Sequence, residues 1–233
     1  MDFKNIVIML AGGSGGRYGK EKQFETINGI PVFIQALKNI KDYYVVLTVP
    51  KNKYVDAMCI LYTYTSSINP SRVVSIIEGG ATRQESCYNA IRYIEQRWPE
   101  CKRVAVTEAS RPCITSKTVS KCLKEVKKNN AVITACKSIN TSVTVIPNTS
   151  HINNILDRKY QYDLLMPECF DFKKLKQIRH HEFEHYTSLL ETYSNAYLLD
   201  ELSIVEISRW EGLKLTYKED YDIIKYLLSK ENI

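Results

Sequence analysis

Short apolar runs alternate with amphipathic segments along the first 136 residues of the chain. The apolar runs have the length of strands and occupy 6–10, 43–49, 72–77, 103–106 and 131–136. The segments with helical periodicity occupy 30–37, 56–64, 82–97 and 116–128. This alternation predicts an α/β, Rossmann-like fold in three layers, with a mainly parallel sheet and helices on both faces.

Local signals place the start of several helices. Thr82 followed by Glu85 is a capping box, which predicts a helix from there to Arg97. Ser116 is expected to cap the helix that ends near residue 128, and Pro31 is expected in the first turn of the helix at 30–37.

The pattern changes after residue 137. Short β-prone pieces, broken by Pro147-Asn148 and Asn153-Asn154, predict a β-arm at about 138–156 that protrudes from a single domain spanning 1–233. Because isolated hairpins are marginal in water, the arm is expected to contact something, a second subunit being one candidate. The later segments are expected to be helical at 171–176, 183–198 and 219–227, and strand-like at 202–207 and 213–216.

Composition narrows the class of protein. The formal charge of +6 comes without any block of five like charges, so nucleic-acid binding is not expected, whereas a small anionic substrate is. Seven scattered cysteines without a C-x-x-C motif argue against a disulfide framework or zinc site and favour a reducing, cytoplasmic location. No apolar run approaches the roughly 18 residues of a membrane span, and no signal peptide is expected.

Glycines and cations follow the first apolar run directly. Gly12, Gly13, Gly15 and Gly16 precede Arg17, Gly19, Lys20 and Lys22. Bare backbone N–H groups at the end of a strand bind phosphate oxygens, and basic side chains strengthen that binding. The spacing fits neither the dinucleotide fingerprint nor the Walker A loop.

Two further polar clusters, at 79–86 and 107–112, also follow predicted strands. Ligands of parallel sheets bind at the carboxyl ends of the strands, so these clusters and residues 11–24 are expected to form one site.

The first loop, L-A-G-G-x-G-x-R-x-G followed by K-Q-F, resembles the signature of sugar and polyol nucleotidyltransferases. More narrowly, the chain resembles the cytidylyltransferases that act on ribitol phosphate or methylerythritol phosphate. Gly79 to Ser86 resembles the family segment G-G-x-x-R-x-x-S, and Thr107 to Pro112 resembles H-D-A-A/V-R-P. Thr141, the block from Asp157-Arg158 to Phe170, and Lys214 follow in the family's order.

The resemblance implies that CTP and a polyol phosphate give a CDP-polyol and pyrophosphate, with Mg²⁺ or Mn²⁺ as the cofactor. It implies catalytic roles for Arg17, Lys22 and Lys214. It implies that the nucleotide binds at Ala11, Gly12, Gly13, Gly15, Gly80, Ala81, Arg83 and Ser86. It assigns the acceptor to Glu108, Arg111, Thr141 and Arg158, and assigns the metal ion to Glu108. It also implies a homodimer in which the β-arm reaches the other subunit.

Three departures from the family pattern leave alternatives open. Glu108 and Glu211 stand where the family has aspartate or another acid, so each carboxylate lies about 1.5 Å further out on the same backbone. The family's T-D-[DE]-A-S segment has no clean counterpart, residues 187–191 being the nearest. Glu108 could instead pair with Arg111, Lys214 could face outward from a strand, and Ser86 could serve only the helix terminus.

The loops at 11–13 and 22–24, and the R-P-x-I-T segment at 111–115, are more similar to the ribitol-phosphate branch, whose products serve surface-polymer synthesis. The methylerythritol-phosphate branch of isoprenoid synthesis is the alternative. A relative that uses UTP or GTP, and a nucleotide-binding relative without catalysis, are the other hypotheses.

Overall fold

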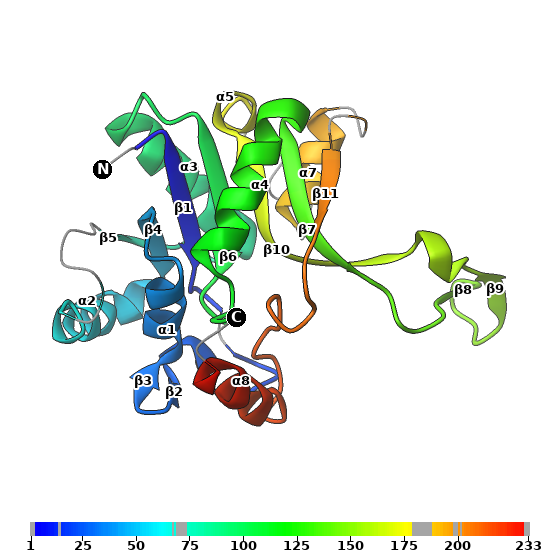
Figure 1. Cartoon of the computed structure of the whole chain (residues 1–233), viewed down its shortest axis with the longest axis horizontal. Coiled ribbons are helices and arrows are strands. Elements are labelled where there is room, and N and C mark those ends of the chain that lie inside the picture. The colour runs from blue at the N-terminus through cyan, green and yellow to red at the C-terminus, as the bar shows by residue number, and fades with distance from the viewer. Residues whose placement is uncertain are drawn as a thin grey trace.

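A seven-stranded sheet forms the centre of the computed structural model (Figure 1). Six strands run parallel: β1 (Asn5–Leu10), β4 (Tyr44–Val49), β5 (Val74–Glu78), β6 (Arg103–Glu108), β7 (Ala131–Lys137) and β11 (Leu202–Glu206). The seventh, β10 (Tyr162–Asp171), lies antiparallel between β6 and β7, which gives the order β11-β7-β10-β6-β1-β4-β5. The structure describes residues 3–13, 15–66, 68, 74–178, 188–197, 200 and 202–230.

The helices of the described ranges connect or follow these strands. They are α1 (Val32–Asn39), α2 (Tyr54–Thr63), α3 (Arg83–Arg97), α4 (Ser116–Asn129), α5 (Phe172–Leu175), α7 (Leu189–Ala196) and α8 (Asp220–Ser229). None of the helices in the described part of the chain has the length and apolar character needed to cross a membrane.

Two helix starts differ from the sequence prediction. The N-cap of α4 is Thr115, whose hydroxyl accepts the N–H of Thr118, so Ser116 is the first helical residue and not the cap. Ile30 and Pro31 form the short strand β3 (Ile30–Pro31), which pairs with β2 (Thr26–Ile27), and α1 therefore begins only at Val32. Thr82 caps α3 as predicted, accepting the N–H of Glu85.

Helices cover both faces of the sheet, which confirms the predicted three-layer fold. On one face α1 lies beside α4, and Asn39 donates a hydrogen bond of 2.6 Å to the carbonyl of Pro112. On the other face α3 lies beside α7, and Gln84 donates a hydrogen bond of 2.6 Å to Thr192. The side chains of β1 from Ile6 to Met9 are fully buried, as expected of a central parallel strand that is covered on both sides.

The antiparallel strand β10 was not predicted. Pro167 and Glu168 break the apolar pattern in the middle of its sequence, and the register with β7 shifts between Leu164 and Glu168. A proline is tolerated inside a sheet at such an irregularity because the ladder is already interrupted there. The buried residues Cys169 and Phe170 complete the core beside β6.

Residues 213–216 were expected to be strand-like, and this prediction is wrong: the segment is an irregular loop between β11 and α8. Leu215 donates its N–H to the carbonyl of Ser110 at 2.8 Å, and Arg111 donates to the carbonyl of Gly212. The loop is therefore held against the segment that follows β6. The expected helix at 183–198 is found in part, as α7 over Leu189–Ala196, while 183–187 and 198 lie outside the described residues.

The predicted β-arm is a two-stranded hairpin that stands away from the sheet (Figure 1). Its strands are β8 (Val143–Val145) and β9 (Ile152–Ile155), and every residue of both strands is exposed. Its apolar side chains, among them Val145 and Ile155 at 51% and 64% exposure, have no cover within the described part of this chain.

Candidate active site

A cavity of about 440 Å³ lies at the carboxyl ends of β1 and β6, beside the first turn of α3. It unites the three polar clusters that the sequence placed after strands. The predicted residues that line it are Ala11, Gly12, Gly13, Gly15, Arg17, Lys22, Gly80, Ala81, Arg83, Ser86, Glu108 and Lys214. The prediction that these clusters form one site is therefore consistent with the geometry.

The first glycine loop has a shape that only glycine permits at one position. Gly15 has φ +72°, and a Cβ there would lie 1.7 Å from the carbonyl oxygen of Lys20. Gln23 braces the same loop, because its side-chain amide donates to the carbonyls of Ala11 and Gly13 at 2.8 and 3.0 Å. The sequence pattern did not indicate this role for Gln23, although the residue belongs to the K-Q-F segment that follows the loop.

The second glycine segment is shaped by the start of α3. The Ser86 hydroxyl accepts the N–H of Gly80 at 3.0 Å and donates to the carbonyl of Thr82 at 2.9 Å. The Glu85 carboxylate accepts the N–H of Ala81 at 2.7 Å, and a Cβ on Gly80 would lie only 2.2 Å from the Cγ of the same side chain. Ser86 thus supports the helix terminus and also lines the cavity, so its two alternative roles are compatible.

The cavity is electropositive. Its charged lining residues are Arg17, Lys22, Arg83, Lys214 and Glu108, four cations against one carboxylate. Burial lowers the pKa of Lys22, and the nearby cations Lys214 and Arg17 lower it further while Glu108 opposes them. Such a cluster of like charges favours an anion, which would relieve the repulsion among the cations.

Glu108 lies at the centre of this charge cluster. Its carboxylate meets Lys214 Nζ at 2.6 Å, Arg83 Nε at 3.3 Å and Arg111 Nε at 3.4 Å. Burial by itself would raise the pKa of Glu108, but the charges of Lys214, Arg111 and Arg83 outweigh it and hold the pKa at about 2. Glu108 therefore does pair with Arg111, as the alternative held, and it also pairs with Lys214 and Arg83.

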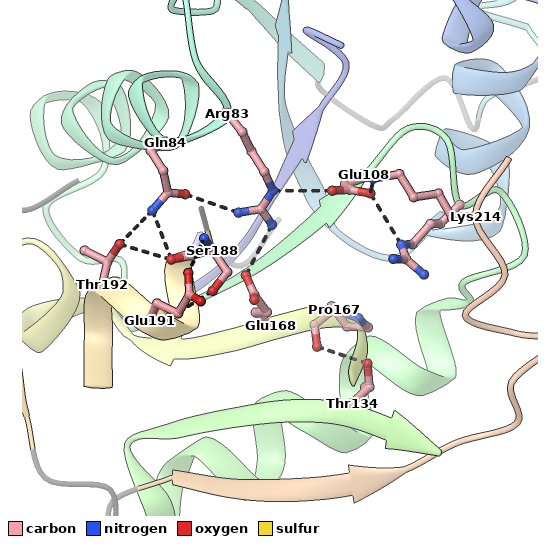
Figure 2. A network of polar contacts seen from close by, with 11 residues as sticks. Arg83, Gln84, Glu108, Thr134, Pro167, Glu168, Ser188, Glu191, Thr192 and Lys214 are labelled. Carbon is pink, nitrogen blue, oxygen red and sulfur yellow. Dashed lines mark hydrogen bonds and ion pairs between the residues drawn. The ribbon is translucent and has the colours of Figure 1, made fainter. Parts of the chain in front are cut away.

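Arg83 connects the cavity to the interior behind it (Figure 2). Its guanidinium group donates to Glu108 on one side and, at 3.4 Å, to the buried carboxylate of Glu168 on the other. A third donor reaches the side-chain oxygen of Gln84, whose amide group is fixed by Thr192. Arg83, predicted to bind nucleotide, is thus largely engaged in holding Glu108, a role the sequence did not indicate.

The loop from residue 209 to 217 brings Lys214 to the cavity. Glu211 anchors this loop to the start of α4, because its carboxylate accepts hydrogen bonds from the hydroxyls of Thr115, at 3.1 Å, and Thr118. The longer acid at position 211 is therefore turned to the helix terminus, and it does not line the cavity. Lys214 does not lie in a strand, and it lines the cavity. The alternative in which Lys214 faces outward from a strand is therefore wrong.

Three predicted acceptor residues lie outside this cavity. Arg111 lines an adjoining cavity and reaches the first only through its contact with Glu108. Thr141 and Arg158 lie on the exposed arm, where the Arg158 guanidinium group donates to the carbonyl of Ile139 at 3.2 Å. Their own chain does not bring them to the site, so their predicted roles depend on a second subunit.

The residues present suit a metal ion that is held mainly by phosphate. Glu108 is the only carboxylate lining the cavity in the part of the chain that the structure describes, and no group of three or more His, Cys, Asp or Glu residues occurs there. Mg²⁺ commonly binds one or two carboxylates together with substrate phosphates and waters. A single carboxylate beside cations that are predicted to bind phosphate would fit that mode.

Comparisons with known proteins agree on one family. The family model described as "IspD: 2-C-methyl-D-erythritol 4-phosphate cytidylyltransferase" matches residues 5–230. The chain is 28% identical to a 2-C-methyl-D-erythritol 4-phosphate cytidylyltransferase of Thermotoga neapolitana over 97% of each chain. It is 25% identical to a ribitol-5-phosphate cytidylyltransferase of Streptococcus agalactiae, over 98% of this chain and 97% of the relative.

The fold has counterparts among solved structures. The 4-diphosphocytidyl-2C-methyl-D-erythritol synthase of Anaerococcus prevotii superimposes with a TM-score of 0.80 at 20% identity, over 97% of this chain and 96% of that one. At this level of identity the likeness concerns the fold, which the sequence predicted.

Proposed function

Because this chain belongs to the family of 2-C-methyl-D-erythritol 4-phosphate cytidylyltransferases, we propose that it joins CTP to a polyol phosphate, ribitol 5-phosphate or a close relative. The observation that carries the proposal is the meeting of two glycine segments with Arg17, Lys22 and Lys214 around one buried carboxylate. The glycine segments suit a nucleotide, and the cations suit its phosphates.

The proposed reaction is an in-line displacement that needs no covalent intermediate. A phosphate oxygen of the acceptor attacks the α-phosphorus of CTP, the bond from the α-phosphorus to the bridging oxygen breaks, and pyrophosphate leaves with the bonding electrons. Arg17 and Lys22 hold triphosphate oxygens, and Lys214 donates to the α-phosphate as negative charge develops there. Glu108 and Gln23 keep the lysine and the glycine loop in place.

The proposal includes Mg²⁺, with Mn²⁺ as a substitute. Glu108 would hold the ion together with phosphate oxygens, and the ion would offset triphosphate charge that the arginine and lysines leave uncompensated. Glu108 already pairs with three cations, so a metal ion would share its carboxylate oxygens with Lys214, Arg83 and Arg111.

The acceptor is the least determined part of the proposal. The loops at 11–13, 22–24 and 111–115 favour ribitol 5-phosphate, whose CDP derivative would serve surface-polymer synthesis. The description of the matching family model favours 2-C-methyl-D-erythritol 4-phosphate as the second candidate.

The test is to incubate the enzyme with CTP and each acceptor and to read product masses and pyrophosphate release. CDP-ribitol as the dominant product supports the proposal, and dominance of the methylerythritol product replaces it by the second candidate. No product from any polyol phosphate, with folded protein, contradicts the proposed activity. The same assays with UTP and GTP test the choice of nucleotide.

The proposed assembly is a homodimer in which the arm of each subunit reaches the site of the other. Its support is the exposed apolar hairpin, together with the position of Thr141 and Arg158 on that arm. A cytoplasmic location remains part of the proposal, and the seven free cysteines support it.

A further inference from the structure

A second cavity, of about 490 Å³, adjoins the nucleotide cavity. Arg17 and Lys214 line both cavities, so the two share a wall of two cations. A ligand in the second cavity can therefore place a phosphate against these cations while the rest of the ligand stays out of the nucleotide cavity. Asp163, Arg209 and Trp210 line part of the second cavity, and these three residues have no role in the proposed binding of CTP.

Two large aromatic side chains line the second cavity without being packed into the core. Trp210 and Tyr217 are 49% and 50% exposed, although both lie in the loop that carries Lys214. Trp210 lies in a turn, where its indole ring contributes surface to the cavity. An aromatic ring that is half open in a concave site offers a flat apolar surface to a ligand at little cost in conformational entropy.

A charged pair lines the same cavity. Arg209 Nη2 lies 3.5 Å from Asp163 Oδ2, and the other oxygen of Asp163 accepts the hydroxyl of Ser138 at 2.6 Å. Ser138 thereby fixes Asp163 at the root of the arm. Both members of the pair remain partly exposed, at 32% for Arg209 and 53% for Asp163. A guanidinium group has five N–H donors, so Arg209 keeps donors for a ligand.

The lining thus combines a cationic wall, a flat aromatic surface and a donor–acceptor pair. These match the three parts of a phosphorylated polyol: the phosphate, the C–H groups of its carbon chain, and its hydroxyls. An extended five-carbon chain spans roughly 5 Å, a length that a cavity of this size accommodates. Asp220, the other carboxylate of the lining, already accepts the N–H groups of Thr216 and Tyr217, so it serves mainly to hold the loop.

We propose that the second cavity holds the hydroxylated chain of the acceptor, with Trp210 against its carbon atoms and with Asp163 and Arg209 bonded to its hydroxyls. This inference rests on the proposed function and adds to it the residues that select the acceptor. A site that bonds a hydroxyl discriminates against an analogue that lacks it, because the polar groups of the site are then left unpaired. The pair formed by Asp163 and Arg209 therefore favours an acceptor that carries hydroxyls within reach of these two side chains.

The first test separates acceptor binding from nucleotide binding. Trp210→Ala and Arg209→Gln should each raise the KM for ribitol 5-phosphate by about tenfold or more, while the Kd for CTP, measured by calorimetry without acceptor, stays within about twofold. The matched controls are Tyr226→Ala and Arg92→Gln, two exposed positions on α8 and α3 that should change neither constant. An unchanged KM in both test variants, or a loss of CTP affinity as large as the rise in KM, would overturn the inference.

The second test does not depend on turnover. The chain has two tryptophans, and Trp98 is buried in the core, so Trp210 supplies the exposed indole emission. Ribitol 5-phosphate, added to enzyme that holds a CTP analogue with a non-cleavable α–β linkage, should change the emission of the wild type but not that of Trp210→Phe. Binding without any change in emission contradicts the placement of the acceptor. If the wild type turns over no polyol phosphate, the proposed function fails, and this titration still decides whether the cavity binds a phosphorylated polyol.

Discussion

Lys214 Nζ lies 2.6 Å from Glu108 Oε2, so the cation assigned to the α-phosphate is paired with the carboxylate assigned to the metal. A lysine ammonium group has three donors, and Lys214 can hold Glu108 with one of them while it offers others to a phosphate. The pair thus fixes the position of the lysine before any chemistry. It also links the loop at 209–217 to the end of strand β6, because Lys214 belongs to the loop and Glu108 is the last residue of the strand.

The first prediction concerns the cations of the glycine loop. Arg17→Ala and Lys22→Ala should each lower kcat/KM by about 100-fold or more, because each removes a donor that we propose binds triphosphate oxygens. Lys124→Ala, at an exposed position on α4, is the matched control and should keep wild-type turnover. Near-normal kcat/KM in either test variant, with the fold intact by circular dichroism, would show that the nucleotide phosphates bind elsewhere.

The second prediction concerns the metal. Because both oxygens of Glu108 face cations, Mg²⁺ alone should not raise the Tm, whereas Mg²⁺ with CTP should raise it above the value for CTP alone. Activity should vanish in excess EDTA and return with Mg²⁺ or Mn²⁺. Full turnover in excess chelator would reject the metal. A Tm raised by Mg²⁺ without nucleotide would contradict the view that Glu108 binds the metal only together with phosphate oxygens.

The third prediction concerns pH and follows from the pKa of Glu108, about 2 in the folded protein against an ordinary 4.5. Between these values the unfolded chain binds a proton that the folded protein does not, so stability is lost as the pH falls through this window. The contribution is on the order of 3 kcal/mol, fully present above pH 4.5.

The measurement is urea unfolding of the wild type and of Glu108→Gln at several pH values. The difference in unfolding free energy between them should be largest near neutral pH and should shrink towards pH 2. Glu125→Gln, which removes an exposed partner of Lys128, should cost less than about 1 kcal/mol. A difference for Glu108→Gln that does not vary with pH would contradict the ion-pair account.

The fourth prediction concerns the anchor of the Lys214 loop. Glu211→Ala removes the acceptor of the Thr115 and Thr118 hydroxyls and should lower the unfolding free energy by about 1–2 kcal/mol. It should also lower kcat, because Lys214 loses its fixed position. Glu211→Gln keeps an oxygen that accepts the same bonds and should restore most of both quantities. Equal damage in the two variants would mean that charge, and not hydrogen bonding, holds the loop.

Much of this fold could be predicted because its signals are local. β1 is buried on both faces from Ile6 onward, so its residues from Ile6 to Leu10 are all apolar and the strand can be recognised without knowing its neighbours. The cap at Thr82 and the demand for glycine at Gly15 are likewise decided within a few residues. Because each glycine or polar segment follows a strand, the sequence could predict that the cavity lies at the carboxyl ends of the strands.

The features that were missed depend on residues far apart in the sequence. Glu168 and Arg83 are separated by 85 positions, and their contact gives Arg83 a role inside the protein that its motif does not indicate. β10 is an antiparallel strand between two parallel ones, and its central Pro167 hides the strand pattern. Similarly, no periodicity shows that Trp210 lines a cavity, since that depends on how an irregular loop folds back.

The last prediction concerns assembly, which the sequence and the fold address together. Thr141 and Arg158 are assigned to the acceptor, yet both lie on an exposed arm away from their own chain's cavity. If the arm acts in the other subunit, Lys22→Ala subunits and Arg158→Ala subunits complement each other. In a mixed dimer one site then collects both lesions and the other site collects none. Random exchange at equal input gives about half mixed dimers, so about a quarter of wild-type activity should return. No recovery, with exchange established by native mass spectrometry, would mean that Arg158 does not act across the dimer.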